Sequence, residues 1–107
     1  MKYTGQMFYW DGKEVTKIVT EAVITQDRVA IDWDEGEHLG HLEAKSTDGI
    51  HFSGHYGYPV TYDVYRCEFT LYKAEDEVLL YGTWYEANAG WEGVWLFKLS
   101  PAPTAGP

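Results

Sequence analysis

The chain has a single cysteine and no long hydrophobic run. Cys67 is the one cysteine among 107 residues, which excludes an intramolecular disulfide. No segment approaches the ~20 consecutive apolar residues that a membrane-spanning helix needs. The first residues, MKYTGQMF, lack the apolar core of a signal peptide. We therefore expect a protein that is not exported, lies in the cytoplasm and has no membrane partner.

Basic residues are also scarce. Eight Lys and Arg residues stand against 17 Asp and Glu residues, which gives a formal net charge of -9. The basic residues are scattered singly along the chain. Because phosphate backbones are anionic, we do not expect so acidic a protein to bind nucleic acid.

Catalytic and cofactor motifs are missing as well. The chain has no G-x-S-x-G, no phosphate-binding loop and no dinucleotide fingerprint. We therefore assign no catalytic residue and expect no cofactor. The best acid or base candidate is Glu86, which is expected near Tyr65 at a strand end.

Aromatic and β-branched residues are abundant. Hydrophobic residues make up 45% of the chain and aromatic residues 17%, with nine Tyr and five Trp. Such side chains favour strands, and turn signals such as Asp11-Gly12 and Asp48-Gly49 recur at short spacing. The pattern predicts eight strands, near residues 2–10, 14–25, 28–34, 38–46, 50–58, 62–73, 77–87 and 91–99.

The length fits one domain, which we assign to residues 1–99, with a flexible C-terminal tail at 100–107. The expected fold is all-β, an antiparallel eight-stranded meander closed into a barrel, because closure removes exposed strand edges. An open β-sandwich is the alternative. Segment 14–25 also fits one face of a helix, although its many β-branched residues favour a strand.

The register of the last three strands follows from the positions of large and small side chains. With the hairpin tip at Glu75-Asp76, Phe69 faces Gly82, which faces Trp95. In the same way Cys67 faces Trp84, which faces Gly93. Large residues lie beside small ones in each row, as dense packing requires. Cys67 is therefore expected to be an inert core thiol.

The opposite face of these strands is rich in tyrosine. It either lines a cavity, packs on another subunit or is a plain surface. If it lines a cavity, it would orient a small ligand, and the candidate ligand-binding residues are Arg66, Glu68, Tyr72, Tyr81 and Tyr85.

All four histidines lie between residues 36 and 56. A three-residue loop at 47–49 gives one consistent apolar face and places His41 opposite His55, whereas a two-residue turn places them on opposite faces. Side chains on opposed residues lie about 5 Å apart at Cβ, close enough to share a metal ion. The alternative is a solvent-facing pair that binds nothing.

Two segments, Phe52 to Tyr56 and Leu80 to Trp84, read alike: apolar, polar, Gly, polar, aromatic. This resembles the strand repeats of calycin-type meander barrels, the avidin and lipocalin families. The resemblance implies a barrel with a small apolar ligand inside. The lipocalin Gly-x-Trp lies on the first strand, whereas Gly82-Thr83-Trp84 lies on the seventh expected strand, so no ligand residue carries over.

Three functions remain. The first is a non-catalytic barrel that binds a small ligand in a cavity of several hundred Å³. The second is an acidic interaction or regulatory domain with a filled interior, whose partner is another protein or a second copy of this chain. The third is an enzyme with an acid and base pair in a cleft.

Overall fold

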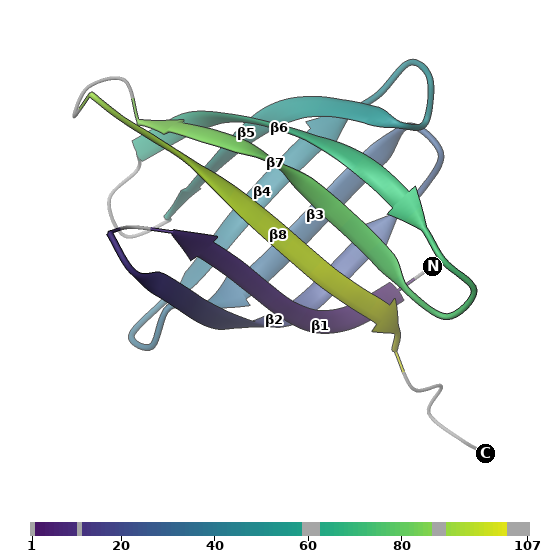
Figure 1. Cartoon of the computed structure of the whole chain (residues 1–107), viewed down its shortest axis with the longest axis horizontal. Coiled ribbons are helices and arrows are strands. Elements are labelled where there is room, and N and C mark those ends of the chain that lie inside the picture. Colours follow the sequence, from purple (N-terminus) through teal and green to yellow (C-terminus); the bar gives the residue numbers. More distant parts are fainter. Residues whose placement is uncertain (1, 11, 59–62, 87–89, 103–107) are drawn as a thin grey trace.

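The computed structural model describes residues 2–10, 12–58, 63–86 and 90–102. Its strands are β1 (Lys2–Trp10), β2 (Glu14–Ile24), β3 (Arg28–Asp34), β4 (Leu39–Lys45), β5 (His51–Tyr58), β6 (Asp63–Lys73), β7 (Val78–Glu86) and β8 (Trp91–Pro101). Each strand pairs with the next one along the chain, and β1 pairs with β8 (Figure 1). The predicted all-β, eight-stranded antiparallel barrel is confirmed, and the open sandwich is excluded.

Residues 14–24 of segment 14–25 form a strand, as its β-branched residues predicted. At the other end, β8 is longer than expected, because Ser100 and Pro101 pair with Thr4 and Tyr3 of β1. The first two residues of the predicted tail therefore belong to the barrel. Residues 62, 87 and 103–107, which the prediction assigned to strand ends and to the tail, lie outside the described residues.

Side chains at alternate positions fill the interior. The register of β6, β7 and β8 is as predicted: Phe69, Gly82 and Trp95 form one row, and Cys67, Trp84 and Gly93 another. The rings of Trp33 and Phe97, with Leu42, Leu80 and Met7, are among the fully buried side chains. An eight-stranded barrel is just wide enough for side chains to occupy its interior.

The register of β4 and β5 differs from the prediction. Glu43, not His41, lies opposite His55, and His41 lies opposite Gly57. The loop after Lys45 is longer than three residues because its own side chains hold it together. Ser46 Oγ accepts hydrogen bonds from the backbone N–H groups of Asp48 and Gly49. The Oδ1 atom of Asp48 accepts those of residues 50 and 51.

Candidate functional site

A small cavity lies within the barrel, between inward-facing aromatic side chains. It has a volume of about 160 Å³, and its lining consists of six aromatic residues, one methionine and one glutamate: Tyr9, Trp33, Tyr56, Tyr58, Trp84, Trp95, Met7 and Glu86. We call this cavity the aromatic cup. Most of these residues lie near the carboxyl ends of β1, β3, β5 and β7. These strands run in one direction in the antiparallel meander, so the cup lies toward one end of the barrel.

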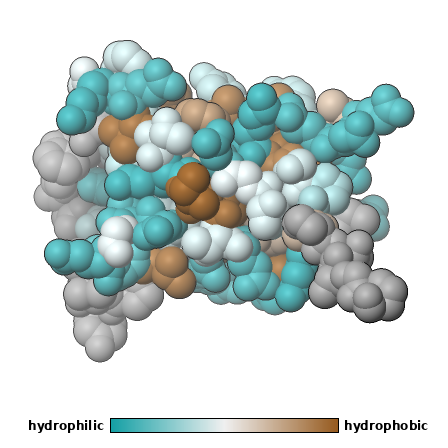
Figure 2. Space-filling model, turned by 90° about the horizontal axis from the view of Figure 1, so that it is seen from below, coloured by the Kyte–Doolittle hydropathy of each residue, from teal (hydrophilic) through white to brown (hydrophobic). Residues whose placement is uncertain are grey.

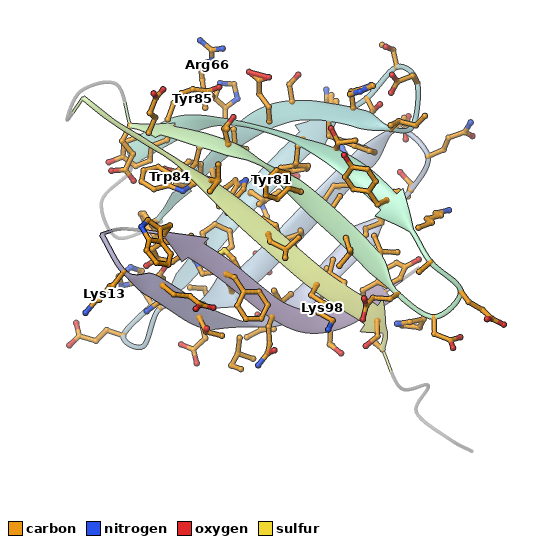
Figure 3. The ribbon with its side chains drawn as sticks, viewed as in Figure 1. Lys13, Arg66, Tyr81, Trp84, Tyr85 and Lys98 are labelled. Carbon is orange, nitrogen blue, oxygen red and sulfur yellow. The ribbon has the colours of Figure 1, made fainter. Side chains whose placement is uncertain are left out.

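Glycines on neighbouring strands make room for two of the indole rings. A Cβ atom on Gly40 would overlap the ring of Trp33. A Cβ atom on Gly93 would lie only 2.5 Å from the ring of Trp84. Trp84 projects from β7 near the left-hand end of the barrel in Figure 3. The glycines therefore let large rings lie flat against the wall and leave space between them.

The rings around the cup meet at steep angles. Trp33 lies at 84° to Tyr58 and at 77° to Trp95, with ring centroids 6.3 and 6.2 Å apart. Tyr56 lies at 89° to Tyr58, with centroids 6.3 Å apart. Rings in this arrangement form adjacent walls of a box, so that several ring faces and edges surround one space.

One carboxylate belongs to the cup. The Tyr56 hydroxyl donates a hydrogen bond of 2.9 Å to Oε1 of Glu86. Burial, and then this bond and the charge of Glu86, raise the pKa of Tyr56 well above its ordinary value. Burial also raises the pKa of Tyr58, helped by the negative charges of Glu35 and Glu86. Both tyrosines therefore stay neutral donors at physiological pH.

The three indole N–H groups of the cup differ in their partners. Trp33 Nε1 donates a bond of 2.6 Å to Oε1 of Glu35, whose other oxygen lies 3.4 Å from Lys17 Nζ. By contrast, the Nε1 atoms of Trp84 and Trp95 are buried and have no hydrogen-bond partner. Trp84 is only 8% exposed and Trp95 3%. A buried donor without a partner costs free energy, so these two indole N–H groups lower the stability of the fold.

The predicted ligand-binding residues lie elsewhere. Arg66, Glu68, Tyr72 and Tyr81 are exposed on the outside of the barrel, and Tyr85 is half-buried there. The guanidinium of Arg66 lies 5.7 Å from the centroid of the Tyr85 ring, and both project away from the barrel in Figure 3. None of these five residues lines the aromatic cup. The face is therefore an outer surface rather than the wall of that cavity.

The two central histidines do not face each other. His41 lies opposite Asp32 of β3, and its Nδ1 is 2.5 Å from Asp32 Oδ1. His55 lies opposite Glu43 and, on its other side, opposite Arg66. The direct juxtaposition on which a shared metal ion depended is absent. Within the described part of the chain, no group of three or more His, Cys, Asp or Glu side chains could hold a metal ion.

Cys67 lies in the core, as predicted, and burial raises the pKa of its thiol to about 12. A thiol held neutral in this way is a poor nucleophile. Glu86, the acid or base candidate, bonds to Tyr56 on β5.

The sequence analysis placed Trp84 and Trp95 in the packed rows of the inner face but did not predict the cup. Its lining comes from five strands, β1, β3, β5, β7 and β8. The signal that was available is the row of inward aromatic residues just before the ends of the odd-numbered strands, such as Tyr9, Trp33 and Tyr58.

Comparison with protein-family models, with curated proteins and with solved structures gave no match for this chain. Among the described residues there is no helix of the length and apolar character needed to cross a membrane.

Proposed function

We propose that the chain is a non-catalytic cytoplasmic binding protein that holds a small ligand in the aromatic cup. The observation that carries the proposal is the cup itself, whose walls are six aromatic side chains with the hydrogen-bonded pair of Tyr56 and Glu86 among them. Apolar walls with a few polar atoms of this kind are typical of small-molecule sites. The calycin resemblance, which implies a small ligand inside a barrel, supports the proposal at the level of fold.

The volume of the cup limits the ligand. About 160 Å³ is less than the several hundred Å³ that the sequence led us to expect, because side chains occupy much of the interior. Ligand pockets for drug-sized molecules measure roughly 300 to 1,000 Å³. The cup therefore takes a molecule, or one end of a molecule, of only a few heavy atoms.

The test is a screen followed through the indole N–H resonances of ¹⁵N-labelled protein. The compounds are small cations, anions and neutral molecules, and the variants Trp84→Phe, Trp95→Phe and Trp10→Phe assign the signals. We expect at least one compound to shift the Trp84 and Trp95 signals. The signal of Trp10, which is exposed on β1 outside the cup, should not move. A screen in which no compound of any class moves the two signals would overturn the proposal.

A second candidate function is protein binding through the outer face. Tyr81 of β7 lies opposite Leu96 of β8, which lies opposite Phe8 of β1, and Tyr81 is 50% exposed. Figure 2, which views another side of the molecule from below, has a small hydrophobic group near the middle of a mostly hydrophilic face. Surfaces of this composition are common at interfaces between proteins.

If the partner is a second copy of the chain, experiments on the purified protein can detect the association directly. Sedimentation over a range of concentrations should show a dimer that Tyr81→Lys disrupts. A monomer at every concentration would contradict self-association through this face.

A further inference from the structure

We propose that the ligand of the aromatic cup is a small organic cation with a methylated ammonium group. This inference rests on the proposed function, since it names the class of ligand that the same cup would take. It goes beyond the calycin resemblance, which implies an apolar ligand.

The walls of the cup favour a cation. Six aromatic residues line it, and three ring pairs among them meet at 77° to 89°. The face of an aromatic ring carries negative electrostatic potential, and Trp and Tyr attract ammonium groups most strongly. Methylated ammonium groups are weakly hydrated and fit between such walls, where a small hydrated ion would lose its water.

The charges around the cup point the same way. Glu86 is its one charged lining residue, and within the described residues no Lys, Arg or His lines the cup. Glu35 accepts the indole N–H of Trp33, but Lys17 Nζ lies 3.4 Å from its other oxygen and offsets its charge, so Glu86 is the carboxylate that acts on the cup. A carboxylate among aromatic side chains repels an anionic ligand and stabilises a cationic one.

The size of the cup limits the rest of the ligand. The cup volume of about 160 Å³ restricts the ligand to a compact head group of this kind.

Choline and its neutral isostere, 3,3-dimethylbutan-1-ol, test this inference. The two molecules share shape and hydroxyl and differ in the positive charge. Both are titrated into the whole chain while the indole N–H signals of Trp84 and Trp95 are followed. We expect choline to bind at least about tenfold more tightly than the isostere, since a desolvated cation over aromatic faces gains about that much.

Glu86→Gln separates the charge from the shape, because Gln still offers an oxygen to the Tyr56 hydroxyl. We expect this variant to lose about tenfold in choline affinity and to bind the isostere unchanged. If the variant does not fold, the comparison of the two ligands on the natural chain decides alone.

The outcomes distinguish the inference from the proposed function. If the isostere, another neutral compound or an anion moves the two indole signals and choline does not, the cation inference is wrong and the cup remains a ligand site. If no compound of any class moves them, both proposals are wrong.

Discussion

The Tyr56 hydroxyl on β5 is hydrogen-bonded, at 2.9 Å, to Oε1 of Glu86 on β7, although β6 lies between these two strands in the sheet. The bond therefore joins strands that share no backbone ladder. The Tyr56 hydroxyl also supplies a hydrogen-bond donor to the carboxylate of Glu86, which lies beside aromatic rings. The two residues line the aromatic cup, so that the bond links the stability of this end of the barrel to the chemistry of the cup.

Tyr56→Phe removes this hydrogen bond and leaves the ring in place. We expect the free energy of unfolding to fall by roughly 1.5 to 3 kcal/mol, because a carboxylate loses a donor in a partly buried site. Urea unfolding at pH 7 measures the change. Tyr81→Phe is the matched control on the outer surface and should change stability by less than ~0.5 kcal/mol. Equal effects of the two substitutions would show that the Tyr56 bond adds nothing.

The buried thiol of Cys67 should make the protein less stable at alkaline pH. Burial raises the pKa of this thiol from 9.0 to about 12, so that above pH 9 the unfolded chain loses its proton while the folded chain keeps it. The contribution is thus fully present below pH 9 and is lost as the pH rises toward 12. The stability difference between the natural chain and Cys67→Ala should shrink by up to ~1.4 kcal/mol per pH unit in this window. Urea unfolding of both proteins from pH 8 to pH 11 tests it, and a constant difference would contradict the buried thiol.

The strands and the register of β6, β7 and β8 could be predicted because large and small side chains alternate across three neighbouring strands. Phe69 and Trp95 both lie beside Gly82 in this register, whereas a shift of two residues between β6 and β7 would place Phe69 beside Leu80 or Trp84.

Gly82→Ala tests that packing argument. A Cβ atom at this position would overlap the carbonyl oxygen of Glu68 and lie 2.5 Å from Cα of Phe69, which are backbone atoms that cannot turn aside. We expect a loss of more than ~3 kcal/mol in the free energy of unfolding, or no folded protein. Gly12→Ala is the control, because nothing lies within 4 Å of its added Cβ. Its φ of 71° is unfavourable for alanine, so we expect a loss of only about 1 kcal/mol in the free energy of unfolding. Wild-type stability of Gly82→Ala, measured by thermal unfolding, would show that β6 and β7 are not so close.

The register of β4 and β5 could not be predicted in this way. The observed pairing of His41 with Gly57 differs from the expected pairing of His41 with His55 by two residues. A shift of two residues keeps every side chain on its own face, so the criterion of a consistent apolar face cannot distinguish the two. The loop chemistry of Ser46 and Asp48 decided between them. The cup escaped prediction for a related reason, because its rings meet across the barrel rather than along one strand or hairpin.

The carboxylate of Asp48, in the loop between β4 and β5, should make the stability of the protein fall at acid pH. The side chain of His51, the backbone N–H groups of residues 51 and 50, and Ser46 all bond to this carboxylate and hold its pKa below the ordinary 3.8. The stabilisation is therefore present above pH 3.8 and is lost as the pH falls below it. The stability of Asp48→Asn should fall less than that of the natural chain between pH 5 and pH 2, as urea midpoints measure. Parallel decreases in the two proteins would mean that these bonds do not favour the charged carboxylate.

The same substitution at two tryptophans that line the cup tests whether the indole N–H of Trp84 lacks a hydrogen-bond partner. Trp33→Phe removes an indole whose N–H donates a hydrogen bond of 2.6 Å to Glu35. Trp84→Phe removes an indole whose N–H has no partner. Both changes cost the packing of the lost ring, but only the first also breaks a hydrogen bond to a charged group. In the ligand-free protein we expect Trp33→Phe to reduce the free energy of unfolding by about 1.5 kcal/mol more than Trp84→Phe. Urea unfolding at pH 7 gives both values. Equal losses would mean that Trp84 also donates a hydrogen bond in solution, for example to an ordered water molecule.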